Sequence, residues 1–255
     1  MCQTQEDLFE AAAQFVVQSL TFQPDSGKTY SVALSGGSTP QRLFVRLAAA
    51  PYRSKVDWSS LCIFWGDERE VPPEHSESNF RMAKENLLDR VPIPPDQIFR
   101  MEGERPAQEA AVRYEKVLHH AFSQNNKEGV PRFDLILLGM GSDGHTASLF
   151  PETAVLEERE QWVAAPWVEK FHTHRITLTP PLFNAAKQVL FVVSGSDKDQ
   201  AAEAVLEGPF QPNRYPAQIV NPVQGDLVWL LDREAASRLK KSSFTEWTRD
   251  NEKML

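Results

Sequence analysis

The chain has 255 residues, enough for one large α/β domain with a buried core or for two small domains. Hydrophobic residues make up 41% and charged residues 24%, which is typical of a globular protein and excludes a disordered or fibrous one. The formal net charge of −8 argues against a broad nucleic-acid-binding surface, because phosphate backbones are bound by an excess of Lys and Arg. A small basic pocket for one phosphate remains compatible with this charge.

The sequence also argues against membrane association. No continuous apolar window of about 18 residues occurs. The first twenty residues carry acids where a signal peptide would carry bases. The two cysteines, Cys2 and Cys62, lie far apart and are expected to be reduced thiols. We therefore expect a cytoplasmic protein that contacts neither membrane nor nucleic acid.

The first half of the chain alternates between helix and strand patterns. Apolar residues between Leu8 and Leu20 recur at helical spacing and predict an opening helix. A β-rich run over 30–34 is followed by a glycine turn and by a helix whose first turn contains Pro40. The next predicted elements are a strand over 61–65, a charged loop over 66–70, and amphipathic helices over 77–91 and 106–122.

The second half continues this alternation. The apolar run between Asp134 and Gly139 predicts a buried central strand. Strands alternating with helices indicate an α/β fold, with a mostly parallel sheet covered on both faces. No 20–50-residue repeat occurs and the proline-rich segments are short, so we expect a single domain over 1–255. The remaining predicted elements are a strand from 175, a proline-started helix, a strand over Val189–Val193, a further helix, and a strand then a helix over 226–240.

In such sheets ligands bind beyond the carboxyl ends of the strands. The rule selects four loops as candidate ligand sites: SGGSTP after Leu34, GDER after Trp65, GMGSDGHT after Leu138 and GSDK after Ser194.

SGGSTP has the composition of an anion site. Gly36 and Gly37 allow a close turn, and Ser35, Ser38 and Thr39 offer hydroxyls. The helix that follows presents free N–H groups and the positive end of its dipole, which favours a phosphate. The alternative is a plain βα turn with hydroxyl capping. The sequence is not a P-loop, so a nucleoside triphosphate is not indicated.

The other charged loops are more ambiguous. Asp67, Glu68 and Arg69 follow one strand, and such clusters are usually solvated ion pairs. Lys198 stands near the start of a helix, where a cation is unfavourable unless an anion lies nearby. Arg175 opens a strand-like run, and its spacing alone does not place it.

GMGSDGHT first suggests a dinucleotide-binding loop, because Gly139-x-Gly141-x-x-Gly144 follows a strand. That interpretation fails twice. No acidic residue stands at the end of a following strand to bind a ribose, and Asp143 would oppose a pyrophosphate.

A catalytic interpretation of the same loop fits better. An imidazole titrates near neutrality and suits general-base chemistry. His145 lies in a glycine-rich turn at the end of a buried strand, and Asp143 is close enough to orient it or to polarise a nearby water.

Other catalytic and metal motifs are missing from the sequence. There is no G-x-S-x-G nucleophile elbow. His172 and His174 lack an evident third zinc ligand, so no metal is expected.

Four motifs occur in this order along the chain: SGGSTP, GDER, S-N-F-x-x-A-x-x-x-L-L and GMGSDGHTASLFP. In this combination of motifs the sequence resembles the 6-phosphogluconolactonase family from about Leu8 to Leu239. The resemblance implies a Rossmann-like α/β fold shared with sugar-phosphate isomerases. It implies hydrolysis of 6-phospho-D-glucono-1,5-lactone to 6-phosphogluconate in the oxidative pentose phosphate pathway, without a cofactor. It leaves open whether the protein is a monomer or a homodimer.

The resemblance also implies roles for particular residues. The loop over 35–39 would bind the substrate phosphate, and Asp143 and His145 would be the catalytic pair. Three cations would surround the substrate, and Gly141 and Gly144 would shape the catalytic loop. These cations are Arg69, Arg175 and Lys198.

Two alternatives stay open. Glucosamine-6-phosphate deaminases are similar in the phosphate loop, at the acidic pair Asp67 and Glu68, and in the Gly-His turn. Five residues beyond the histidine, however, that family has a glutamate where this sequence has Phe150. The second alternative is a sugar-phosphate-binding regulator. Such regulators commonly carry a helix-turn-helix module, and we find no spare segment for one in this sequence.

Overall fold

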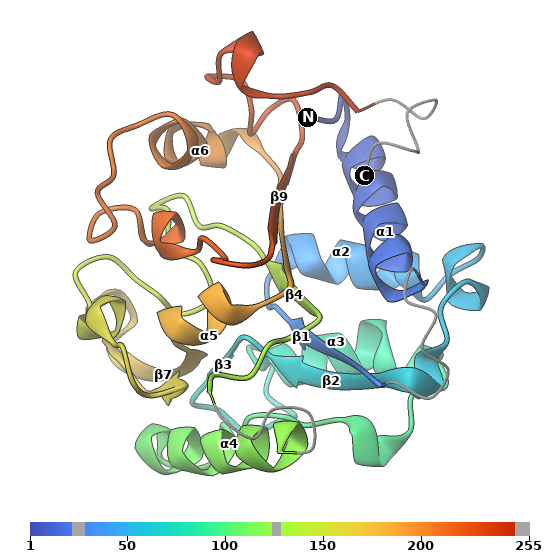
Figure 1. The fold of residues 1–255 in the computed structure, drawn as a ribbon, viewed down its shortest axis with the longest axis vertical. Helices are drawn as coiled ribbons and strands as arrows, with labels where there is room; N and C mark the ends of the chain where they lie inside the picture. Colours follow the sequence, from blue (N-terminus) through green and yellow to red (C-terminus); the bar gives the residue numbers. More distant parts are fainter. Residues whose placement is uncertain (22–28, 124–128, 248–255) are drawn as a thin grey trace.

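The computed structural model describes residues 1–21, 29–123 and 129–247. Its centre is a five-stranded sheet in the order β2-β1-β4-β8-β9 (Figure 1), in which every neighbouring pair is parallel. All residues of β1 and β4 are buried, as parallel strands covered on both faces require. The strands are β1 (Tyr30–Leu34), β2 (Leu61–Trp65), β4 (Leu135–Leu138), β8 (Gln188–Val193) and β9 (Asp226–Leu231).

Helices cover both faces of this sheet. Figure 1 shows α1 and α2 on one side of β4 and β9, and α5 and α6 on the other. The predicted mostly parallel α/β architecture is thus confirmed. The helices are α1 (Gln5–Thr21), α2 (Ser38–Leu47), α3 (Asn79–Asn86), α4 (Ala107–Phe122), α5 (Pro180–Ala185) and α6 (Asp199–Leu206).

A second, antiparallel sheet lies beside the first. Its strands are β3 (Asp67–Arg69), β5 (Val163–Ala164), β6 (Trp167–Val168) and β7 (Thr173–Leu178), and β7 pairs with all three others. The predicted charged loop over 66–70 is therefore wrong at its centre. A three-residue run forms β3 because β7, more than a hundred residues later, supplies its hydrogen-bonding partner.

Two helix predictions also need correction. The helix expected over 77–91 is shorter, since α3 ends at Asn86 and a 3₁₀ turn follows over Leu88–Arg90. The helix expected after β9 does not form, and residues 233–239 make successive turns. The Asp232 carboxylate accepts hydrogen bonds from Gly195 N at 3.1 Å and Ala235 N at 2.8 Å, so it bonds into a turn and to the neighbouring loop.

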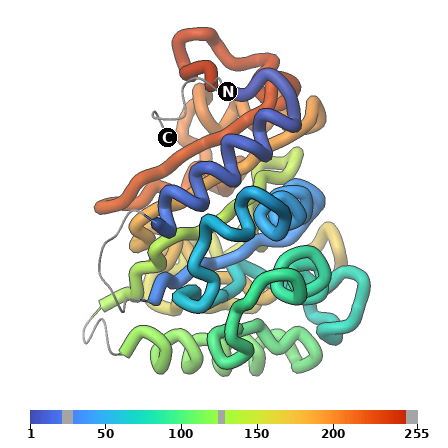
Figure 2. The backbone as a smooth tube through the Cα atoms, turned by 90° about the vertical axis from the view of Figure 1, so that its right-hand side faces the viewer, coloured from blue at the N-terminus to red at the C-terminus, as the bar shows by residue number. Residues whose placement is uncertain are grey.

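The first and last described segments lie side by side. Cys2 N donates to Leu231 O at 2.8 Å, and Trp247 N donates to Met1 O at 2.8 Å. Figure 2 shows α1 running along the face of the sheet near β9. Cys2 and Cys62 are free thiols.

The strand order places the functional loops. Strand β1 lies between β2 and β4 in the sheet. The chain leaving β1 continues to β2 on one side, whereas the chain leaving β4 continues to β8 on the other. A crevice opens at such a switch point in parallel sheets. All four loops selected from the sequence follow strands of this sheet and meet at that edge.

Candidate active site

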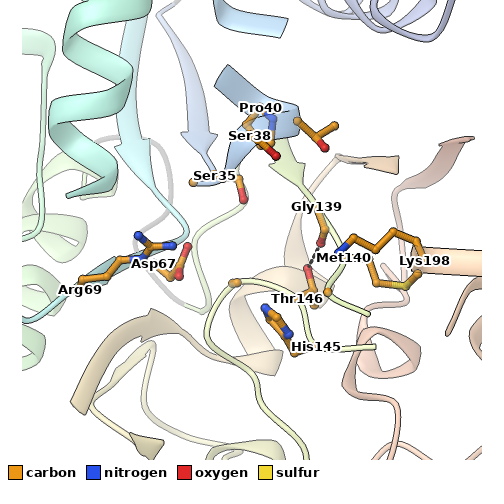
Figure 3. A pocket seen from close by; sticks show the side chains of 15 residues that line it. Ser35, Ser38, Pro40, Asp67, Arg69, Gly139, Met140, His145, Thr146 and Lys198 are labelled. Carbon is orange, nitrogen blue, oxygen red and sulfur yellow. Dashed lines mark hydrogen bonds between the residues drawn. The ribbon is translucent and has the colours of Figure 1, made fainter. Parts of the chain in front are cut away.

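One pocket lies at the carboxyl edge of the parallel sheet and takes residues from all four loops (Figure 3). Figure 3 shows Asp67 and Arg69 on one side, Lys198 on the other, and His145 facing the Ser35–Ser38 segment from across the pocket. The lining residues are Ser35, Gly36, Gly37, Ser38, Thr39, Pro40, Asp67, Arg69, Gly139, Met140, Gly141, His145, Thr146, Ala147 and Lys198.

The loop after β1 has the geometry of an anion site. Gly37 precedes α2 with φ +100°, a conformation that favours glycine. The first N–H groups of α2 have no partner within a helix and point out of its N-terminus. Among the described residues, the hydroxyls of Ser38 and Thr39 have no hydrogen-bond partner, so they too are available to a ligand.

A buried contact holds this loop against β3. A Cβ at Gly36 would lie 1.8 Å from Asn79 Oδ1, so only glycine fits. Asn79 Nδ2 donates to Asp67 O at 2.8 Å, and Ser148 Oγ donates to Asp67 Oδ2 at 2.8 Å. The Asp67 carboxylate is therefore fixed in the pocket wall.

Glu68 lies outside the pocket lining, although its neighbours on both sides belong to it. Its carboxylate accepts hydrogen bonds from Asn79 N at 2.7 Å and Phe80 N at 2.8 Å, at the N-terminus of α3. Burial raises the pKa of Glu68, against the opposing effect of these bonds. Glu68 thus attaches α3 to β3.

The two arginines of the second sheet occupy different places. Arg69 lines the pocket and donates to Glu77 O, whereas the Arg175 guanidinium lies 5.0 Å from the centre of the Phe171 ring and outside the lining. The two residues are register partners on β3 and β7. Burial, and then the charge of Arg69, lowers the pKa of Arg175.

Lys198 closes the opposite side of the pocket. It ends the 3₁₀ turn Ser196–Lys198, directly before α6. Its ammonium contacts Asp197 Oδ2 at 2.8 Å, and the side chain is 22% exposed. Asp197 thus supplies the nearby anion that offsets the unfavourable helix N-terminus, and a cation is held at the edge of the pocket.

Glycines shape the loop after β4. Gly141 N donates to His145 O at 2.8 Å, and Gly144, with φ +76°, donates to Gly141 O at 3.0 Å. A Cβ at Gly141 would lie 2.1 Å from the His145 ring. Thr146 Oγ1 donates to Gly139 O at 2.8 Å and closes the loop.

Asp143 orients the His145 ring. Its Oδ1 atom bonds His145 Nδ1 and accepts from His145 N at 3.2 Å, and its Oδ2 atom accepts from Lys170 Nζ at 3.0 Å. Burial alone would raise the pKa of Asp143, but the bond and charge of His145, with those of Lys170, hold it well below its ordinary value. An ionised Asp143 favours the tautomer with the proton on Nδ1, which leaves Nε2 as a base.

Phe150 forms the other wall around the imidazole. Its ring stacks on His145 with centroids 4.2 Å apart and planes at 24°. Phe171 in turn meets Phe150 edge to face at 5.6 Å. The residue that distinguishes this sequence from the deaminase pattern is therefore in direct contact with the histidine.

Sequence reasoning missed several residues of this region. Met140, Thr146 and Ala147 line the pocket, and Ala147 adopts φ +47°, which is uncommon for a residue other than glycine. Thr146 and Ala147 follow His145 directly, so adjacency was an available signal. Lys170 and Phe171 reach the site from the 3₁₀ turn Glu169–Phe171 between β6 and β7, and no local pattern in the sequence marks them.

In residues 1–21, 29–123 and 129–247, no group of three or more His, Cys, Asp or Glu side chains is placed to hold a metal ion. Across the same described residues, none of the helices combines the length and apolar character that crossing a membrane would require.

Comparison with known proteins identifies the family of the chain. The family described as glucosamine-6-phosphate isomerases/6-phosphogluconolactonase matches residues 3–229. The chain belongs to this family. The "6-phosphogluconolactonase" of Nostoc sp. is 42% identical over 212 residues, covering 82% of this chain and 85% of that protein.

Two further relatives extend the comparison. The "Probable 6-phosphogluconolactonase 2" of Oryza sativa subsp. indica is 36% identical, covering 93% of this chain and 88% of that one. The solved 6-phosphogluconolactonase from Trypanosoma cruzi has a TM-score of 0.83 at 28% identity, covering 94% of this chain and 96% of that one. The fold and the family are therefore shared across nearly the whole chain.

Proposed function

We propose that this protein hydrolyses 6-phospho-D-glucono-1,5-lactone to 6-phospho-D-gluconate, with His145 as general base, as a step of the oxidative pentose phosphate pathway. One observation carries the proposal: an anion-binding loop and an aspartate-oriented histidine face each other across a single pocket. The names of the family's relatives support the same reaction.

The substrate phosphate docks at the N-terminus of α2. Backbone N–H groups and the hydroxyls of Ser38 and Thr39 surround it there, and Lys198 supplies a cation. The phosphate is remote from the reacting carbonyl, so binding it orients the lactone without taking part in the bond changes. Arg175 does not line the pocket, so we assign it no direct contact with the phosphate.

The chemical step uses a water molecule. His145 Nε2 takes a proton from this water as its oxygen attacks the lactone carbonyl carbon, and the carbonyl electrons move onto oxygen. The Arg69 guanidinium lines the same pocket and stabilises this oxyanion. The tetrahedral intermediate then collapses, the ring C–O bond breaks, and the imidazolium returns the proton to the departing ring oxygen.

Deaminase activity is the competing function within this family. Its sequence pattern has a carboxylate at the position of Phe150, and a phenyl ring cannot transfer a proton. The stacking of Phe150 on His145 leaves no carboxylate at that contact. We therefore expect no ammonia release from glucosamine 6-phosphate.

The test compares the wild-type protein with His145→Ala. We expect kcat/KM for the lactone to fall by about 10²–10⁴-fold, the usual contribution of a general base. Hydrolysis is followed by acid release after subtraction of the spontaneous rate, and ammonia release from glucosamine 6-phosphate is measured in parallel.

His120→Ala is the matched control, because His120 is exposed on α4 and does not line the pocket. This variant is expected to retain the wild-type rate. A near wild-type rate in His145→Ala would overturn the role of His145. Ammonia release without lactone hydrolysis would overturn the function itself.

A further inference from the structure

Lys170 reaches the catalytic loop from a separate part of the fold. It lies in the 3₁₀ turn Glu169–Phe171, which connects β6 to β7 in the second sheet. Its ammonium lies 3.0 Å from Asp143 Oδ2, while Asp143 Oδ1 bonds the His145 ring. The two carboxylate oxygens thus have different partners, and the plane of the carboxylate is set from both sides.

The same turn makes a second contact with the site. Phe171, next to Lys170, packs edge to face on Phe150, which stacks on His145. The turn is therefore linked to the His145 ring in two ways, by aromatic contacts through Phe150 and by an ion pair through Asp143. Lys170 does not line the pocket and is 55% exposed, whereas Asp143 and His145 are 29% and 26% exposed.

We propose that Lys170 is a positioning residue, which fixes the Asp143 carboxylate for His145 and neutralises part of the charge of that carboxylate. This inference rests on the proposed function for its catalytic consequence. The effect on the imidazole itself is independent of any substrate.

The direction of the effect follows from charge. An ionised Asp143 stabilises the imidazolium, and a cation on its other oxygen weakens that stabilisation. Removing the cation therefore leaves the full negative charge of Asp143 beside the His145 ring and frees the Oδ2 atom of the carboxylate.

Other charged groups surround the pair and must stay unchanged in the test. Asp67, Arg69 and Lys198 line the same pocket as His145, and the Arg175 guanidinium lies 5.0 Å from the centre of the Phe171 ring. Tyr215 packs on Gly144, and Arg214 lies over the Tyr215 ring. All of them are present in each variant below, so they cancel in the comparison.

The experiment compares wild type with Lys170→Met and Lys170→Arg. The His145 imidazole is titrated by NMR with labelled histidine, its signal being assigned by its loss in His145→Ala. We expect the measured midpoint of the His145 titration to move to higher pH in Lys170→Met and to stay at the wild-type position in Lys170→Arg. The acid limb of the pH profile of kcat/KM should shift by the same amount, with KM at the plateau unchanged.

Lys84→Met is the matched control, because Lys84 is a similarly exposed lysine that forms an ion pair with Asp89, away from the pocket. It is expected to leave the His145 titration unchanged. An unchanged midpoint in Lys170→Met, or a shift that Lys170→Arg does not restore, would overturn the proposal. The NMR titration gives this answer even if the protein proves not to hydrolyse the lactone, so the two failures are distinguishable.

Discussion

At the scale of single residues, the loop after β4 depends on a glycine without a side chain as much as on the side chains of Asp143 and His145. The His145 ring lies between the carboxylate of Asp143, the ring of Phe150 and the backbone of Gly141. A glycine at 141 leaves the volume that the imidazole fills. The position of the His145 ring is thus set by close packing, and under the proposed function small changes there should affect catalysis more than stability.

Gly141→Ala tests this packing. The new Cβ would lie 2.1 Å from the His145 ring and 2.7 Å from Asp143 Oδ1, so the ring must move. We expect kcat for the lactone to fall by about 10²-fold, as a displacement of about 1 Å does in well-oriented sites. The NMR signal of the Nδ1 proton shared with Asp143 should disappear.

Gly139→Ala is the control for that signal. A Cβ at Gly139 would meet no heavy atom within 4 Å among the described residues, so the His145–Asp143 hydrogen bond should persist. A Gly141→Ala protein that keeps both the proton signal and full kcat would show that the ring tolerates displacement.

At the scale of elements, a largely buried carboxylate connects three strands of the parallel sheet at the end opposite the pocket. Asp134, just before β4, accepts from Ser31 N on β1 at 2.9 Å and from Lys187 Nζ, before β8, at 2.6 Å. Burial alone would raise the pKa of Asp134, but the bonds to Lys187 and Ser31 outweigh it and lower the pKa. The ionised carboxylate therefore stabilises the folded state.

Asp134→Asn should destabilise the protein at neutral pH by about 1–3 kcal/mol, the usual cost of disrupting buried hydrogen bonds to a charged group. Because the folded-state pKa is lowered, this stability is present above the unfolded pKa of about 3.9 and is lost as the pH falls through the folded value. Urea unfolding at pH 7 and pH 3 measures the difference between variant and wild type, which should shrink at pH 3.

Asp226→Asn serves as the control for this series. Asp226 begins β9 as an exposed residue, so its substitution should leave the free energy of unfolding nearly unchanged. A difference between Asp134→Asn and wild type that does not depend on pH would contradict the charge-based explanation.

At the scale of the whole molecule, the pocket joins loops from four strands of one sheet and a strand of the other. A ligand bound there contacts segments near residues 35, 69, 145 and 198 at once. Binding should therefore stabilise the complete fold, because unfolding of either sheet would destroy the site.

We expect 6-phosphogluconate to raise the melting temperature and gluconate to leave it unchanged. At a concentration 100 times Kd, the phosphorylated ligand adds about 2.7 kcal/mol, which corresponds to roughly 5–10 °C for a chain of this size. Thermal unfolding followed by circular dichroism measures the shift. Lys198→Met should reduce it and Lys116→Met, an exposed change on α4, should not. Equal shifts with both ligands would contradict phosphate recognition.

The sequence by itself determined the alternation of elements, the parallel sheet and the loops that carry its chemistry. These features depend on local patterns: buried strands are continuous apolar runs, and the residues of SGGSTP and GMGSDGHT act close to where they stand in the chain. Asp143 orients His145 from only two residues away, so the local sequence is enough to predict that the two act as a pair.

Only the tertiary structure decided which distant residues join that pair. Strand β3 forms by pairing with β7, and this pairing places Glu68 beside α3 and Arg175 outside the pocket lining. Lys170 approaches Asp143 from the turn directly before β7. The predicted final helix does not form, and residues 233–239 make turns instead. Contacts between segments far apart in the chain leave no periodic pattern in the sequence, and one of them brings Lys170 to Asp143, the hydrogen-bond partner of His145.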